Sequence, residues 1–419
     1  MTANQSAPTD VAFGELAAAV RANDIERASE VLLRHPELAS RMNDPMPEAA
    51  FGALVIAPAV THKNVAMIEL LLRHGADINA RSHWWAGSFG VLDVCEPEFA
   101  PALIERGARV DSHAAARLGM LDRLEVLVAA DPGLVHARGG DGQTPLHFAS
   151  TVHIAEFLLD HGANIDALDV DHESTPAQYM VRERQDVARM LVERGCRTDI
   201  LMAAALGQSE LVRRFIDADA RSVRTRVSRD YFPMRDARAG GTIYIWTLGG
   251  NKTAHVIARE FGHPDIVQLL LEHSPDELKI VVACELGDEE LVRTLIAQQP
   301  QLAQRLSDED RRRLVDAAES NNATAVRLML EAGWPTDARG NLGATALHFG
   351  AWMGNAEIVS ELLRHGAPVD AHGDEYDLSP LGWALHGSKN SWRKASGDYS
   401  GVIEALLNAG ARPTGPESG

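Results

Sequence analysis

The chain alternates short apolar stretches with polar reversals, and this alternation returns along most of its length. Its best-preserved instance is residues 141–169, DGQTPLHFASTVHIAEFLLDHGANIDALD. A glycine-containing turn comes first, and apolar residues then gather after Thr144 and again before Gly162. Pro145 suits the first turn of a helix, because the N–H that it lacks would have no partner there. Gly162 suits the left-handed residue that closes a helix, so the stretch predicts two short helices joined by a tight reversal.

The ending of the second helix recurs along the chain as leucine-rich residues followed in the clearest copies by glycine. Clear copies start at Leu70, Leu103, Leu191, Met329 and Leu362, and weaker copies start at Leu32, Leu127, Phe215, Leu270, Leu295 and Leu406. One pair of helices this short cannot bury its own apolar face, so each pair requires stacked neighbours. The recurrence therefore predicts an array of about twelve units.

This pattern resembles the ankyrin repeat family, whose period of about 33 residues and T-P-L-H signature match here. The signature is nearly intact at residues 144–147 and again at residues 345–348, which read TALH. The resemblance covers almost the whole chain and implies an all-α ankyrin-repeat solenoid in which β-turn fingers connect the helix pairs. It also implies that His147 and His348 bridge the backbones of adjacent units.

The intervals between helix endings predict where the array is shortened. Three intervals are shorter than the period of about 33 residues, and the shortfall matches the turn between units. We therefore expect fingers to be missing at residues 111–113, 198–200 and 274–276, where one helix should run almost directly into the next.

Two longer intervals predict insertions. Residues 227–250 form the first, in which Gly240 and Gly241 mark a turn and residues 242–247 are β-branched or aromatic, so we expect an extended finger shaped like a β-hairpin. Residues 387–400 form the second, between two helices of one unit. We expect this second insertion to lie at the base of the array, away from the fingertips, and to cap its end.

These observations give the predicted domain organisation. Residues 1–10 are expected to be a disordered tail, residues 11–410 a single solenoid, and residues 411–419 a second tail.

Composition narrows the classes of partner and compartment. The 419 residues include 40 Lys+Arg against 59 Asp+Glu, a net charge of −19, which disfavours nucleic acid and anionic membranes as partners. Cys95, Cys196 and Cys284 are few and far apart, as expected of reduced structural thiols. No apolar run reaches the ~18 residues of a membrane span, and the first residues do not resemble a signal peptide, so a cytoplasmic location is expected.

Four residues are candidates for acid–base chemistry. Asp171, His172 and Glu173 lie in one finger, where carboxylates beside a histidine can ligate a metal or act as base and acid. The preferred interpretation is a solvated fingertip. His255 stands where the family carries leucine, and it is either a core histidine with hydrogen-bond partners or a group reaching the long finger. Because no HExxH or paired CxxC motif is present, no metal and no cofactor are assigned.

Aromatic residues give the stronger indication of a binding surface. The resemblance implies that the residue after the T-P-L-H histidine faces the concave groove. Aromatic residues hold that position or its helical neighbour at Phe148, Tyr179, Phe349, Trp352 and Trp383. Further aromatic residues lie in two loops, Trp84 with Trp85 and Tyr231 with Tyr244 and Trp246. Exposed aromatic side chains mark interaction sites, and the alternative is that these rings pack on each other under the fingers.

Two functional hypotheses follow. The leading one is a recognition protein that binds a partner protein or peptide in its concave aromatic groove, without catalysis. The alternative is a small-molecule-binding protein or an enzyme with a pocket between the concave helices and the finger at residues 227–250. That pocket would take an anionic metabolite, with Arg229 and Arg235 as anion binders and Trp84, Tyr231, Tyr244 and Trp246 as walls. An enclosed pocket with a titratable group would favour the alternative, and an open groove would favour the first.

Overall fold

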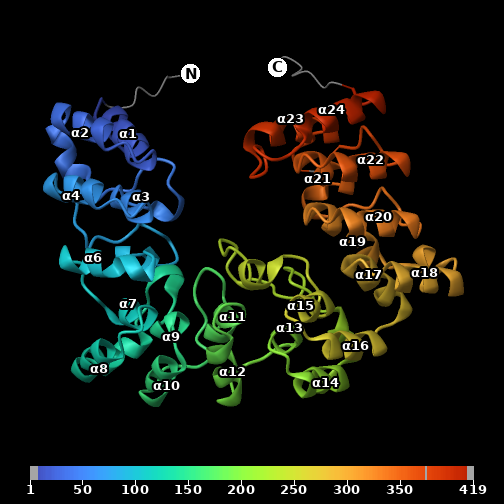
Figure 1. Ribbon diagram of the computed structural model, residues 1–419, viewed down its shortest axis with the longest axis horizontal. Coiled ribbons are helices and arrows are strands. Elements are labelled where there is room, and N and C mark those ends of the chain that lie inside the picture. Colours follow the sequence, from blue (N-terminus) through green and yellow to red (C-terminus); the bar gives the residue numbers. More distant parts are fainter. Residues whose placement is uncertain (1–7, 373–374, 413–419) are drawn as a thin grey trace. The chain divides into compact units, whose positions relative to one another are not determined.

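The computed structural model describes residues 8–372 and 375–412, which form twelve successive pairs of α-helices (Figure 1). Within these ranges no β-strand forms, and the predicted all-α fold of about twelve helix pairs is confirmed. The chain divides into two compact units. Unit 1 contains residues 8–198 and 232–247, and unit 2 contains residues 199–231 and 248–412.

The pairs of unit 1 involve helices of four to 14 residues. They are α1 (Pro8–Arg21) with α2 (Ile25–Arg34), α3 (Ile56–Thr61) with α4 (Val65–Arg73), α5 (Val91–Val94) with α6 (Ala100–Glu105), α7 (Ser112–Arg117) with α8 (Leu121–Ala130), α9 (Pro145–Phe148) with α10 (Val152–Asp160), and α11 (Pro176–Met180) with α12 (Gln185–Glu193).

Unit 2 has the same organisation: each helix contacts its partner, and each first helix contacts the first helix of the next pair. The pairs are α13 (Ile200–Ala205) with α14 (Ser209–Ala218), α15 (Ala254–Glu260) with α16 (Pro264–Glu272), α17 (Asp276–Leu286) with α18 (Glu289–Gln298), α19 (Asp308–Glu319) with α20 (Ala323–Glu331), α21 (Ala346–Trp352) with α22 (Ala356–Arg364), and α23 (Pro380–Asn390) with α24 (Tyr399–Asn408).

The pair α9 and α10 shows how the local sequence sets the ends of a helix pair. Pro145 begins α9, and the Thr151 hydroxyl caps α10 by accepting a hydrogen bond from the backbone N–H of Ile154 at 3.3 Å. Gly162 follows α10 with φ of 91°, a left-handed conformation that glycine adopts without steric cost. The apolar side chains between these ends, such as Leu158, are buried against the neighbouring pairs.

The T-P-L-H histidines bridge adjacent helix pairs, as the resemblance implied. In His147, Nδ1 accepts the backbone N–H of Thr144 at 3.1 Å, and Nε2 donates to the carbonyl of Ser174 in the next finger at 3.2 Å. His348 repeats this arrangement with Thr345 and Leu378, both at 3.1 Å. Each imidazole is buried and uses both nitrogens in its neutral form. Burial lowers the pKa of His147 to about 3 and that of His348 to about 4.

The predicted short junctions are confirmed. Helix α6 ends at Glu105 and α7 begins at Ser112. The step from α12 to α13 is equally short, and the step from α16 to α17 is shorter still. The prediction of a disordered tail over residues 1–10 is wrong for residues 8–10, because α1 begins at Pro8, and residues 1–7 lie outside the described ranges. Residues 413–419 also lie outside them, and a single solenoid over residues 11–410 stays a prediction.

The first insertion is present, but its predicted β-hairpin is wrong. Residues 232–247 belong to unit 1. They do not pair with a second strand, and their backbone instead forms hydrogen bonds with the finger at residues 171–174. The Gly240 N–H donates to the carbonyl of Asp171 at 2.9 Å, and the Ile243 N–H donates to the hydroxyl of Ser174 at 3.1 Å. The segment then ends in a π-helical turn, η7 (Ile245–Gly249). The finger at residues 171–174 thus supplies acceptors for backbone N–H groups of the insertion that would bond to each other in a hairpin.

The second insertion also differs from its prediction. Helix α23 continues to Asn390, so only residues 391–398 remain as a loop, and this loop returns toward α21 instead of capping the base. Gly387 permits the close approach of α23 to α21, because a Cβ at this position would lie 2.7 Å from the carbonyl oxygen of Trp352. The loop therefore brings Trp392 against Trp352.

Two further expectations can be compared with the described residues. Cys95, Cys196 and Cys284 are free thiols and buried, as predicted. Within residues 8–372 and 375–412, no helix combines the length and the apolar character needed to cross a membrane.

Candidate functional site

Unit 2 contains a hollow lined mainly by aromatic side chains, which we call the aromatic hollow. Its volume is about 470 Å³, within the range of sites that hold small ligands or single side chains of a partner. The lining residues come from α19, α21, α23 and the loops beside them. They are Glu319, Leu342, Phe349, Trp352, Tyr376, Leu378, Trp383, His386 and Trp392.

Trp383 organises the rings of the aromatic hollow. Its ring centroid lies 5.4 Å from that of Phe349, 6.3 Å from that of Trp352 and 6.3 Å from that of Tyr376, with interplanar angles of 76°, 77° and 65°. Such edge-to-face contacts are the preferred geometry of aromatic pairs. His386 stacks on the other side of the cluster, at 5.6 Å from Trp352.

The hollow has a buried floor and an exposed rim. Phe349 and Trp383 are only 5% and 6% exposed, whereas Trp392 is 74% exposed and Tyr376 55%. Leu342 on the rim has φ of 59°, a conformation that is uncommon for leucine and that places it at the fingertip. Large apolar side chains thus stand in solvent around a cavity.

Two polar groups belong to this site. Glu319 accepts hydrogen bonds from the side-chain amides of Asn341 (3.1 and 3.3 Å) and Asn251 (3.2 Å), and burial raises the pKa of its carboxyl group. The indole Nε1 of Trp383 is buried and has no hydrogen-bond partner among the described residues. A buried donor without an acceptor costs free energy.

The sequence predicted only part of this site. Phe349, Trp352 and Trp383 were expected to face a common groove, and they do meet in the hollow. Tyr376 and Trp392 were missed as site residues. Both are aromatic, which is the signal that could have identified them. Trp392 lies in residues 387–400, which were expected at the base of the array, and Tyr376 lies in the finger before α23.

The aromatic residues predicted on the first insertion do not form one wall. Tyr244 is completely buried and packs edge-to-face on Phe232 at 5.3 Å, so its assignment as a pocket wall is corrected to a core position. Trp246 is 73% exposed. Tyr231 belongs to unit 2, where its hydroxyl donates to Glu309 at 2.8 Å.

The remaining aromatic candidates lie in unit 1. Trp84 packs against Phe51 at 5.0 Å and against Trp85 at 6.1 Å, and the guanidinium of Arg238 lies 4.2 Å above the Trp85 ring. Phe148 is half-buried beside His113, and Tyr179 donates from its hydroxyl to Asp169 at 3.0 Å. Much of this predicted surface is therefore occupied by the chain itself.

The arginines of the first insertion and of the residues before it differ in their surroundings. Arg226 is buried and pairs with Asp316, and Arg224 bonds to Asp310 at 2.9 Å. Arg229 and Arg235 are exposed. The arginines that the fold holds in place thus serve ion pairs within unit 2.

His255 is a core residue. Its side chain is completely buried, and Nε2 lies 3.0 Å from the hydroxyl oxygen of Ser274, which itself donates to the carbonyl of Leu270 at 2.7 Å. Nε2 therefore carries the proton, and burial lowers the pKa of His255 to about 4. The interpretation of His255 as a core histidine is confirmed, because its side chain bonds to Ser274 and not to the first insertion.

Asp171 and His172 are not a solvated fingertip, because the first insertion covers them. They are 5% and 9% exposed, and the carbonyl of Gly241 accepts a hydrogen bond from His172 Nδ1 at 2.7 Å. Glu173 is half-buried and accepts the backbone N–H groups of Arg235 and Asp236 at 2.9 and 2.8 Å. The preferred interpretation of this finger is therefore wrong, since the backbone of the insertion replaces solvent there.

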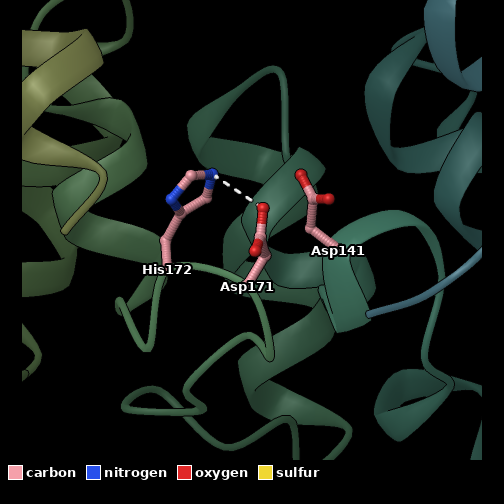
Figure 2. A group of neighbouring side chains, drawn as sticks. All are labelled: Asp141, Asp171 and His172. Carbon is pink, nitrogen blue, oxygen red and sulfur yellow. Dashed lines mark ion pairs between the residues drawn. The ribbon is translucent and has the colours of Figure 1, made fainter. Parts of the chain in front are cut away.

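A third acidic residue reaches this cluster from the preceding finger. Figure 2 shows Asp141 beside Asp171 and His172, and one ligand atom from each residue lies within 4.8 Å of the other two. His172 Nε2 is 3.7 Å from Asp171 Oδ2. Burial and the neighbouring carboxylates raise the pKa of Asp141 to about 6, although the charge of His172 opposes this shift.

Comparison with known families decides the classification of the chain. A family model described as ankyrin repeats (3 copies) matches residues 112–201, 280–373 and 314–414, and a single ankyrin repeat model matches residues 59–83. The first model alone covers more than half of the 419 residues. The chain belongs to the ankyrin repeat family. Ankyrin repeats generally mediate protein–protein interactions.

The relatives of this ankyrin repeat protein are varied. It is 32% identical over 126 residues to the palmitoyltransferase Hip14 of Drosophila melanogaster, covering 30% of this chain and 18% of that protein. It is 32% identical over 153 residues to the human ankyrin repeat and SOCS box protein 6, covering 36% and 31% of the two chains. The chain thus spans less than a third of either relative.

A bacterial relative covers more of its length. A putative ankyrin repeat-containing protein of Treponema pallidum is 25% identical over 269 residues, covering 61% of this chain and 73% of that protein. Among solved structures, the ankyrin repeat domain of human ASB11 aligns with 73% of this chain and 100% of its own, at 18% identity and a TM-score of 0.27.

Proposed function

We propose that this ankyrin repeat protein binds a segment of a partner protein by taking one of its large apolar side chains into the aromatic hollow of unit 2. The observation that carries the proposal is the exposure of Trp392 and Tyr376, at 74% and 55%, around a cavity whose floor is buried. Rings that fold into the core gain burial from folding, whereas these two gain it only from a partner.

The magnitude is sufficient for an anchor residue. A tryptophan buries ~150–250 Å² when fully covered. At roughly 25 cal/mol per Å², covering the exposed part of Trp392 contributes about 3–5 kcal/mol before ordering costs. Removing such an anchor typically weakens binding by at least ~2 kcal/mol, or about 30-fold.

The polar groups indicate the chemistry of the partner segment. Lys389 and Lys394 are exposed on either side of Trp392, which favours an acidic residue near the anchor. The partner segment is therefore apolar at its centre and acidic at its flank.

Selection of short random peptides on the full chain tests this proposal. We expect enriched peptides with a large apolar residue beside an acidic one, whose recovery is lost on the Trp392→Ala and Tyr376→Ala variants. Trp246→Ala is the matched control, since Trp246 is equally exposed, at 73%, but lies on the first insertion. Enrichment that is insensitive to the two hollow variants, or that is lost only with Trp246, would contradict the proposal.

A small organic cation is the second candidate ligand. Among the described residues, the lining of the hollow includes the carboxylate of Glu319 and neither lysine nor arginine, and its rings meet at steep angles. Aromatic faces and a carboxylate attract ammonium groups. The charge of this candidate ligand is therefore opposite to that of the anionic metabolite expected from the sequence. A thermal shift with tetramethylammonium that disappears in Trp352→Ala would support this candidate, and no shift at millimolar concentration would exclude it.

A further inference from the structure

We propose that Asp141, Asp171 and His172 of unit 1 form a binding site for one divalent transition-metal ion, of the class that Zn²⁺ represents. The three residues come from two successive fingers, and their ligand atoms lie within 4.8 Å of one another (Figure 2). Imidazole nitrogen with carboxylate oxygen is a donor set that suits zinc, iron and manganese. Three protein ligands leave a further position for water.

The tautomer of His172 is the first observation that points to a cation. Its Nδ1–H donates to the carbonyl of Gly241 at 2.7 Å, so in the neutral imidazole Nε2 carries a bare lone pair. This Nε2 makes no hydrogen bond within the described residues, in a side chain that is about nine-tenths buried, and it faces Asp171 Oδ2 at 3.7 Å. A hydrogen bond from the other ring nitrogen to a backbone carbonyl is how proteins orient a metal-binding histidine.

The carboxylates give a second, independent observation. Oδ1 of Asp141 is buried and makes no hydrogen bond of normal geometry among the described residues, although the indole N–H of Trp84 lies near enough to lower the pKa of this carboxyl group. The side chain of Asp171 is only 7% exposed. Two carboxylates and an imidazole lone pair that face one point repel each other unless a cation lies between them. That cation is either a proton on one of the three side chains or a metal ion, and the two can be distinguished by experiment.

The dimensions and the surrounding backbone are compatible with the ion. Zinc bonds of ~2.0–2.2 Å in a tetrahedral site place ligand atoms roughly 3.4 Å apart, so the 3.7 Å between His172 and Asp171 is already close. The carbonyl oxygen of Asp141 accepts the N–H of Val170 at 2.7 Å, which fixes the two fingers against each other. The ligand atoms of Asp141, Asp171 and His172 all lie within 4.8 Å of one another, so Asp141 needs to approach the other two to complete a tetrahedral set.

The ion would also strengthen the attachment of the first insertion. The Gly240 N–H donates to the carbonyl of Asp171, and the Gly241 carbonyl accepts from His172, so backbone of the insertion forms the surroundings of the site. Metal on Nε2 makes the opposite ring N–H a stronger donor to Gly241. Exchange of the amide protons of Gly240 and Ile243 should therefore slow when the metal binds.

Calorimetric titration of the metal-free full chain with Zn²⁺ tests the proposal. We expect one saturable site, with affinity reduced at least ~10-fold in Asp141→Asn and in Asp171→Asn. Asparagine accepts the left-handed conformation at position 141, where φ is 53°, and at position 171 it can still accept the Gly240 N–H. Both variants are therefore expected to fold, which circular dichroism checks.

Glu173→Gln provides the matched control, because Glu173 contacts the insertion from the same finger but is not a member of the cluster. It should bind Zn²⁺ like the wild type, and hydrogen–deuterium exchange at Gly240 and Ile243 should slow with Zn²⁺ in both proteins. Absence of saturable binding would show that the cluster holds no metal ion. Binding that survives in both asparagine variants would place the metal on other histidines, and either result overturns the proposal.

Discussion

Replacement of Arg226 by methionine should destabilise unit 2 by ~3 kcal/mol. Arg226 is 4% exposed, and its guanidinium forms an ion pair with Asp316, which is itself 8% exposed. Breaking a buried ion pair from one side costs about 3–5 kcal/mol, because the remaining charge stays buried. Asp316 keeps a second partner, Arg313, at 3.3 Å, so the lower end of this range applies. Methionine retains most of the apolar contacts of the arginine stem.

The free energy of unfolding from urea titration, followed by circular dichroism, measures this effect, and hydrogen exchange over α19 shows whether the loss is local to the pair. Arg229→Met is the control, because Arg229 is exposed three residues away and should change stability by no more than ~0.5 kcal/mol. Equal stability of the two variants would refute the reasoning that the buried arginine holds the start of the first insertion in unit 2.

Three further predictions follow from buried groups. Stability should fall as the pH drops from 6.5 toward 4. In the folded chain the pKa values of His147, His255 and His348 are about 3, 4 and 4, so over this range only the unfolded chain takes up their protons. Each histidine contributes up to ~1.4 kcal/mol per pH unit, and a urea midpoint as high at pH 5 as at pH 7 would contradict this. Gly387→Ala should cost ~1–3 kcal/mol, since its methyl group would meet the backbone of the neighbouring helix, and a melting temperature equal to that of the wild type would argue against this contact. The thiol of Cys284, whose pKa is raised by burial, should resist alkylation at pH 8 until the protein unfolds, whereas rapid labelling of the native chain would show that it is accessible.

The architecture was predictable because its determinants are local and repeated. A proline in the first turn and a left-handed glycine after the second helix, as at Pro145 and Gly162, set the ends of each pair without reference to the rest of the chain. The same local logic placed Phe349 and Trp383 on one face, since both follow a helix start by a fixed number of residues. Spacing alone also located the missing fingers.

The parts that failed depend on contacts between distant residues. Trp392 reaches the aromatic hollow only because α23 continues past Gly387, and that continuation depends on packing against Trp352. The first insertion has the composition of a hairpin, but its amides find their acceptors in the finger around Asp171. No sequence pattern records such pairing, and for the same reason the meeting of Asp141 with His172 could not be foreseen.

The dissociation constant of a selected peptide for the wild type, for Trp392→Ala and for Trp246→Ala tests most directly whether the aromatic hollow recognises a partner. Isothermal titration should give a value at least ~30-fold higher for Trp392→Ala and an unchanged value for Trp246→Ala. If all three proteins bind the peptide equally well, the exposed rings around Trp383 are not the recognition surface.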